Sequence, residues 1–160
     1  MKKLIQFGLT ISFLLFFLLV SLYEGSELLQ NPFEWGSSTP ITNLFHKEIT
    51  DSEQLSSLDF FFYALKFKPT YPILVMLTAI YLIFLVGRQL VKHNNLRFRY
   101  FSILFSTLLL IIGVFSLGST TAGAQLAAKV LLVTSMLTFG IIALQIFLPN
   151  KTNRIVRNLL

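Results

Sequence analysis

Long apolar runs alternate with short polar connections along the chain, which is the pattern of a protein that crosses a membrane several times. The first run, Leu4 to Tyr23, contains no charged residue. A helix of that length, rising 1.5 Å per residue, covers about 30 Å, the thickness of the hydrocarbon core of a bilayer. Three further runs have the same character. The predicted spans are residues 4–23, 71–87, 100–117 and 124–148.

The connections predict how these spans are joined. A short basic segment, Arg88 to Arg99, follows the second span, and a tight turn at residues 118–121 follows the third. Helices are the expected structure, because the hydrocarbon core offers no water to exposed backbone groups. We expect an all-α membrane protein, a single integral membrane domain over residues 1–160. It has four transmembrane helices in a bundle and a long outer loop, residues 24–70, that carries a short amphipathic helix.

The first run is expected to stay in the protein as an anchor. A cleaved signal peptide is the alternative, but its apolar region usually has about 7–15 residues and ends in small residues. The run here is longer, and Ser21-Leu22-Tyr23 is a poor cleavage site.

Charges divide between the two sides of the predicted bundle. The positive-inside rule counts Lys and Arg near span ends, so the asymmetry predicts a multi-pass protein with both termini in the cytoplasm. The basic side holds Lys2, Lys3, Arg88, Lys92, Arg97, Arg99, Lys151, Arg154 and Arg157, whereas the other side holds Lys47, Lys66, Lys68 and Lys129. All seven acidic residues fall in the outer loop: Glu24, Glu27, Glu34, Glu48, Asp51, Glu53 and Asp59.

Composition narrows the possible functions. Only 12% of the residues are charged, about half the share in a soluble domain, which favours a membrane protein. The absence of Cys excludes disulfides, thiolate metal sites and palmitoylation. The net charge of +6 is explained by topology and by contact with anionic lipid. No aromatic and basic platform accompanies it, so we expect no nucleic-acid partner.

The outer loop is the only segment large enough for a function outside the membrane. Asn31-Pro32 and Thr39-Pro40 mark turns, because a residue before proline is pushed out of the helical region. Phe33 and Trp35 alternate with Glu34, so both rings can face the lipid headgroups, where aromatic residues are favoured. The candidate interfacial or interaction residues are Glu24, Glu27, Pro32, Phe33, Glu34 and Trp35.

The end of this loop predicts the amphipathic helix. Asp51 is expected to cap it, and apolar residues then recur at spacings of three and four up to residue 67. Ser56, Asp59 and Lys66 fall largely on other faces. Such a helix can lie in the outer interface, and the alternative is a lid on the mouth of the bundle.

Catalytic and metal chemistry have weak signals. Glu24, Glu27 and Glu34 can pair for acid–base work, but a solvated collar at the end of the span explains them more simply. A metal site from the carboxylates and His46 in the loop matches no ligand spacing. We therefore predict no catalytic residue, no metal and no cofactor.

Two features lie within the spans. Small residues recur four apart in the third and fourth spans, which favours close helix packing within the bundle, with contact between copies of the chain as the alternative. Lys129 is the only charge inside an apolar run, a possible intramembrane polar site. It lies near the outer end, where its stem can carry the ammonium group to water.

A resemblance follows from the first part of the chain. Tyr23-Glu24-Gly25-Ser26, Leu28-Leu29 and Asn31-Pro32-Phe33-Glu34-Trp35 come after a Phe-rich span behind basic residues. Over about the first 45 residues the chain resembles the YjdJ-like family, small uncharacterised membrane proteins of Bacillus-type bacteria. The resemblance implies a bacterial cell membrane and no known activity.

The preferred hypothesis is a non-enzymatic envelope protein that presents the outer loop to a partner. Its partners would be the lipid bilayer and either another membrane protein or further copies of itself. Two alternatives stay open: a lipid-modifying enzyme that uses carboxylates near Glu24 and Glu34, and a small transporter or pore.

Overall fold

The computed structural model describes residues 2–46, 48–91 and 95–147, and all regular structure in them is helical. The long helices are α1 (Lys2–Gly25), α5 (Thr70–Leu90), α6 (Asn95–Leu117) and α7 (Ala122–Phe147). Between α1 and α5 lies a folded segment, residues 26–46 and 48–68, which we call the cap. It holds three turns of 3-10 helix and three short α-helices: η1 (Ser26–Gln30), η2 (Pro32–Glu34), α2 (Trp35–Ser38), α3 (Thr42–Phe45), η3 (Ser52–Gln54) and α4 (Ser57–Phe67).

Four helices within the described residues are long and apolar enough to cross a membrane, and they coincide with the four predicted spans. α5 ends at Leu90, a turn further than predicted, and α6 begins five residues earlier, at Asn95. The predicted end of the last span, residue 148, and the basic residues Lys92, Lys151, Arg154 and Arg157 lie outside the described residues.

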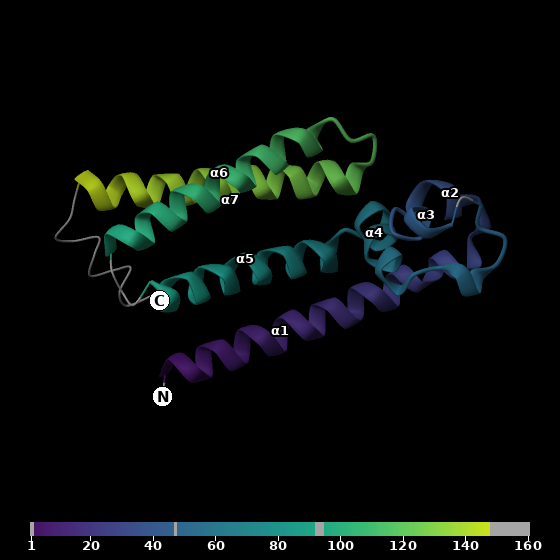
Figure 1. Ribbon diagram of the computed structural model, residues 1–160, viewed down its shortest axis with the longest axis horizontal. Coiled ribbons are helices and arrows are strands. Elements are labelled where there is room, and N and C mark those ends of the chain that lie inside the picture. Colours follow the sequence, from purple (N-terminus) through teal and green to yellow (C-terminus); the bar gives the residue numbers. More distant parts are fainter. Residues whose placement is uncertain (1, 47, 92–94, 148–160) are drawn as a thin grey trace.

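The long helices form two neighbouring pairs, α1 beside α5 and α6 beside α7 (Figure 1). The cap lies at one end of the molecule, the end at which α6 turns into α7. The start of α1, the end of α5 and the start of α6 lie at the opposite end. The cap therefore forms a small folded unit at one end of the molecule.

Small residues form the seam between α6 and α7. Ser135 is fully buried and its hydroxyl donates to the backbone carbonyl of Ser106 at 3.1 Å. Ala128 is also fully buried, and Leu132 packs against Gly113. The small residues expected to bring helices together therefore pack within the chain, as the spacing predicted.

Aromatic rings connect the two helix pairs. Phe84 of α5 meets Phe101 and Phe105 of α6 edge to face, with ring centroids 6.4 and 5.3 Å apart. Such edge-to-face contacts match the negative face of one ring with the positive rim of another. A buried cluster of Ile80, Leu109 and Leu131 also joins α5, α6 and α7.

Two glycines let α4 approach the long helices closely. A Cβ at Gly25, at the end of α1, would overlap the backbone carbonyl of Phe60 in α4. A Cβ at Gly123, in the first turn of α7, would overlap the carbonyl of Leu65. α4 is therefore held between α1 and α7, with one glycine on each side.

The expected boundaries and orientation of the amphipathic helix were wrong. Asp51 caps only the short η3 turn, whereas α4 begins at Ser57 with the Ser56 side chain as its cap. Asp59 is fully buried, but Leu58 is 60% exposed. The polar residue points inward because α4 packs against other parts of the chain that supply hydrogen-bond donors.

Candidate functional site

The two predicted proline turns shape the start of the cap. Asn31 and Thr39, each before a proline, have ψ angles of 76° and 62°, outside the helical region. Between these breaks Pro32 opens η2, which runs directly into α2. The segment is therefore helical, and Phe33 and Trp35 do not alternate as they would in an extended chain.

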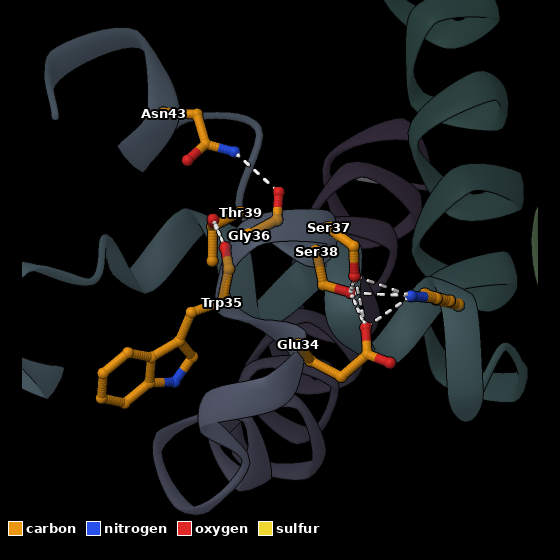
Figure 2. Close-up of polar contacts among 8 residues, drawn as sticks. Glu34, Trp35, Gly36, Ser37, Ser38, Thr39 and Asn43 are labelled. Carbon is orange, nitrogen blue, oxygen red and sulfur yellow. Dashed lines mark hydrogen bonds and ion pairs between the residues drawn. The ribbon is translucent and has the colours of Figure 1, made fainter. Parts of the chain in front are cut away.

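Glu34 is the centre of a polar cluster. Its Oε2 accepts hydrogen bonds from Ser37 at 2.7 Å and Ser38 at 2.6 Å (Figure 2). The ammonium group of Lys66, in α4, lies 2.5 Å from the same oxygen and donates to Ser38 at 3.0 Å. Both charged side chains are 23% exposed. The cluster thus fastens the proline-bounded segment to α4.

These contacts change the acidity of Glu34. The hydrogen bond from Lys66, followed by those from Ser38 and Ser37, lowers the pKa of Glu34 from 4.5 to about 2. A carboxylate with this pKa carries no proton near neutral pH, so Glu34 is unsuited to act as a general acid or base there.

The lowered pKa of Glu34 predicts how the stability of the cap depends on pH. Because the pKa of Glu34 is lowered on folding, its contribution to cap stability is complete above about pH 4.5 and is lost as the pH falls towards 2. Acrylamide quenching of Trp35, the neighbouring residue, should rise over that range and stay flat from pH 5 to 8. Glu34→Gln should remove this step, whereas Glu53→Gln, at an exposed site, should keep it. A wild-type step centred near pH 6 would contradict the assignment.

Phe33 and Trp35 lie in different environments. The indole N–H of Trp35 donates to the backbone carbonyl of Leu28 at 2.9 Å, so Trp35 ties η1 to α2. Its ring points away from the Glu34 cluster (Figure 2). Phe33 is 98% exposed. Of the two aromatic residues, Phe33 is the one available to an outside surface.

Glu24 and Glu27 lie at the other attachment of the cap. Glu27 accepts from Lys68, whose ammonium group is 2.5 Å away, and this contact raises the pKa of Lys68, with Glu24 adding a smaller effect. Both partners are well exposed, so the pair contributes little to stability. One carboxylate oxygen of Glu24 is buried without a hydrogen-bond partner among the described residues. Glu24 and Glu27 therefore do not share a site with Glu34.

Asp59 is a central residue that the sequence did not reveal. Its two oxygens accept from the backbone N–H groups of Ile41 and Thr42 at 2.8 and 2.9 Å, and from the Thr42 hydroxyl at 2.5 Å. The Thr42 hydroxyl in turn accepts from the N–H of Ser56 at 2.9 Å. Asp59 thus satisfies N–H groups at the start of α3, which have no backbone acceptor within that helix.

The remaining sequence candidates are placed as follows. Lys129 is exposed on α7, in its second turn. Among the described residues, no group of three or more His, Asp or Glu side chains is arranged to hold a metal ion.

These features define a class of protein: an all-helical chain with four helices long and apolar enough to span a membrane, and a folded cap between the first two. A family model described as a domain of unknown function (DUF4306) matches residues 4–91, and the chain belongs to this family. The match includes the first 45 residues, on which the resemblance to the YjdJ-like family rests, and it extends through α5.

A curated relative supports the same assignment. The chain is similar to the "Uncharacterized protein YjdJ" of Bacillus subtilis (strain 168), with 31% identity over 81 residues, or 49% of this chain and 74% of the relative. No solved structure gives a significant match. The residues matched by the family model hold α1, the cap and α5, whereas α6 and α7 follow beyond them.

Proposed function

We propose that this protein is a multi-pass component of the bacterial cell membrane that presents its cap, on the outer side, to a protein partner. The main support for this proposal is that hydrogen bonds and ion pairs hold the cap together, yet several of its large apolar side chains are exposed. Those with the greatest exposure are Phe33, Leu44, Phe45 and Leu58.

Charge supports a basic protein partner. The exposed side chains of the cap also include four carboxylates, those of Glu27, Glu48, Asp51 and Glu53. An anionic lipid surface would repel this charge, whereas a basic protein surface would complement it. Large exposed apolar side chains often mark protein interaction sites.

The test is recovery of one stoichiometric partner from native membranes after cross-linking. Phe33→Ser should weaken recovery at least about tenfold if the exposed ring is an anchor of about 1.4 kcal/mol or more. Ser57→Ala, also exposed on the cap, should leave recovery unchanged. Equal recovery with both variants would remove the support for Phe33 as a contact.

The proposed orientation places both termini in the cytoplasm. It rests on the charge asymmetry: Arg88, Arg97 and Arg99 belong to the end of the molecule opposite the cap, which carries the acidic residues. The chain has no Cys, so single Cys probes can report it. Ser57→Cys and Thr120→Cys should react with an impermeant reagent on intact cells, and Asn95→Cys only after permeabilisation. Strong labelling of Asn95→Cys in intact cells would reverse the orientation.

The alternative is that Phe33 lies in the lipid headgroup region. The alternation of Phe33 and Trp35 with Glu34 in the sequence indicated this location. A Phe33→Trp probe in a Trp35→Phe background reports on this side chain alone, because Trp35 is the only Trp of the chain. We expect emission typical of water, without quenching by lipids brominated at shallow depth. Strong quenching by these lipids would instead make residues 32–35 a membrane anchor.

The lipid-modifying alternative gains no support from Glu34. Its carboxylate accepts hydrogen bonds from three donors, and with a pKa lowered to about 2 it is a weak base that also carries no proton to give at neutral pH. Glu24, the other carboxylate of that hypothesis, lies in the separate attachment at the end of α1.

A further inference from the structure

Arg88 is a charged residue that lies buried in the last turn of α5. Only 9% of its surface is exposed. Its guanidinium carbon lies 4.9 Å from the centroid of the Phe98 ring, which belongs to the first turn of α6. The preceding residue, Gly87, lets the two helices approach closely, since a Cβ there would overlap the ring of Phe101. Arg88 is therefore held against α6 and does not extend freely into solvent.

The chain has no carboxylate side chain at this end to balance the charge of Arg88. Asp59 is the last acidic residue of the sequence, and all seven acidic residues belong to the cap or to the end of α1. The cap lies at the opposite end of the molecule from the end of α5 (Figure 1). Within the described residues the guanidinium group stacks on Phe98 but makes no hydrogen bond or ion pair. A buried charge normally has such a partner, because removing it from water is costly.

A second guanidinium group, that of Arg99, belongs to the same end of the molecule. Its Nη2 donates to the backbone carbonyl of Gln145, in the last turns of α7, at 2.9 Å. This acceptor is neutral, and the Nε of Arg99 is buried without a partner among the described residues. The start of α6 adds the positive end of a helix dipole, which favours a nearby anion. Positive charge is therefore concentrated here without an acidic side chain to balance it.

The depth of Arg88 in a membrane indicates which anion can balance this charge. α5 and α6 are both long and apolar enough to cross a membrane. In a bilayer, the end of one and the start of the other lie at the level of the lipid headgroups. Basic pockets between transmembrane helices bind acidic headgroups at this level. A planar guanidinium group suits a phosphate in particular, because it can donate two parallel hydrogen bonds to its oxygens.

We propose that the end of α5 and the start of α6 bind the phosphate of an anionic phospholipid, such as phosphatidylglycerol. The phosphate accepts from Arg88, and Arg99 adds positive charge. Stacking on Phe98 holds the guanidinium group in place before the lipid arrives, so less freedom is lost on binding. A zwitterionic lipid fits less well, because its headgroup brings its own cation. The site lies away from the cap, so it does not rest on the protein partner proposed above.

The test is native mass spectrometry of the full chain in detergent with added phosphatidylglycerol. The wild type should retain one lipid, and Arg88→Gln should weaken its retention by at least about tenfold. Arg97→Gln is the matched control, because Arg97 is exposed in the first turn of α6 and its loss changes the net charge equally. An exposed charge is screened by salt, so this control should change retention by less than about threefold. Equal loss in both variants would mean diffuse attraction to a basic surface and would overturn the site.

Thermal unfolding separates lipid binding from a purely structural role of Arg88. Phosphatidylglycerol should raise the unfolding temperature of the wild type, because a ligand stabilises the state that binds it, but not that of Arg88→Gln. The shift caused by lipid is the readout, so a difference between the lipid-free proteins does not obscure it. An equal shift in both proteins, or no shift in the wild type, would overturn the proposal.

Two competitors identify the source of the phosphate. Phosphatidylcholine, which is zwitterionic, should be retained more weakly than phosphatidylglycerol, and millimolar inorganic phosphate should not displace the bound lipid. Equal retention of the two lipids would contradict the preference for an anionic headgroup. Displacement by inorganic phosphate would instead assign the site to a soluble anion.

Discussion

Asp59→Ala is expected to release the cap from its folded state. The substitution would leave the N–H groups of Ile41 and Thr42 and the Thr42 hydroxyl without their acceptor in a buried place. Each buried donor left unsatisfied costs about 1–3 kcal/mol. A total loss of about 3 kcal/mol or more would raise the population of the opened cap by at least about 100-fold.

The opening can be measured with a thiol at Ala64, a small and fully buried residue of α4. In an Ala64→Cys background, the labelling rate follows the fraction of molecules in which α4 is detached. Asp59→Ala should accelerate labelling by about two orders of magnitude. Asp51→Ala, at an exposed site with two long contacts of 3.3 and 3.4 Å from its own turn, should change it by less than about fivefold. Similar rates in both variants would show that Asp59 does not hold the cap.

Gly25→Ala and Gly123→Ala are expected to have the second large effect. Alanine normally favours a helix over glycine by about 1 kcal/mol. At these two positions its Cβ would overlap a backbone carbonyl of α4, which cannot rotate away as a side chain can. Overpacking of this kind typically costs about 1–3 kcal/mol. We expect faster labelling at Ala64→Cys, by about tenfold or more for each variant.

The chain supplies a control for each substitution on the same helix. Gly8 of α1 and Gly140 of α7 have no atom near the position that a Cβ would take. Gly8→Ala and Gly140→Ala should therefore leave labelling unchanged or slow it slightly. If all four variants behaved alike, the effect would belong to helix propensity and not to the contact with α4.

The long helices and the two proline breaks could be predicted from the sequence because each depends on local properties. An uninterrupted apolar run and a residue before proline carry their signal within a few positions. α4 was harder, since the inward face of a short helix depends on what packs against it. The pattern places Asp59 away from the apolar face, but it is buried because Ile41 and Thr42 supply hydrogen-bond donors to its carboxylate.

The candidate site was predictable only in part. Residues 31–35 were recognised as distinctive, and Phe33 is indeed exposed. The partner of Glu34, however, is Lys66, which lies in another element more than thirty positions away. Neither its spacing nor its type distinguished it from Lys68. A contact that depends on how α4 sits against α2 has no signature in a single sequence.

The position of α4 between Gly25 and Gly123 has a consequence for biosynthesis. The ribosome delivers α1, the cap and α5 before it has made α7, because a chain emerges from its amino end. α4 can close against Gly25 early, but its other flank stays uncovered until α7 arrives. The cap is thus the second part of the chain to be made, but its packing is completed only when α7 is present. A substitution that slows the arrival of α7 would leave the cap open to proteolysis, although its position in the sequence is far from the cap.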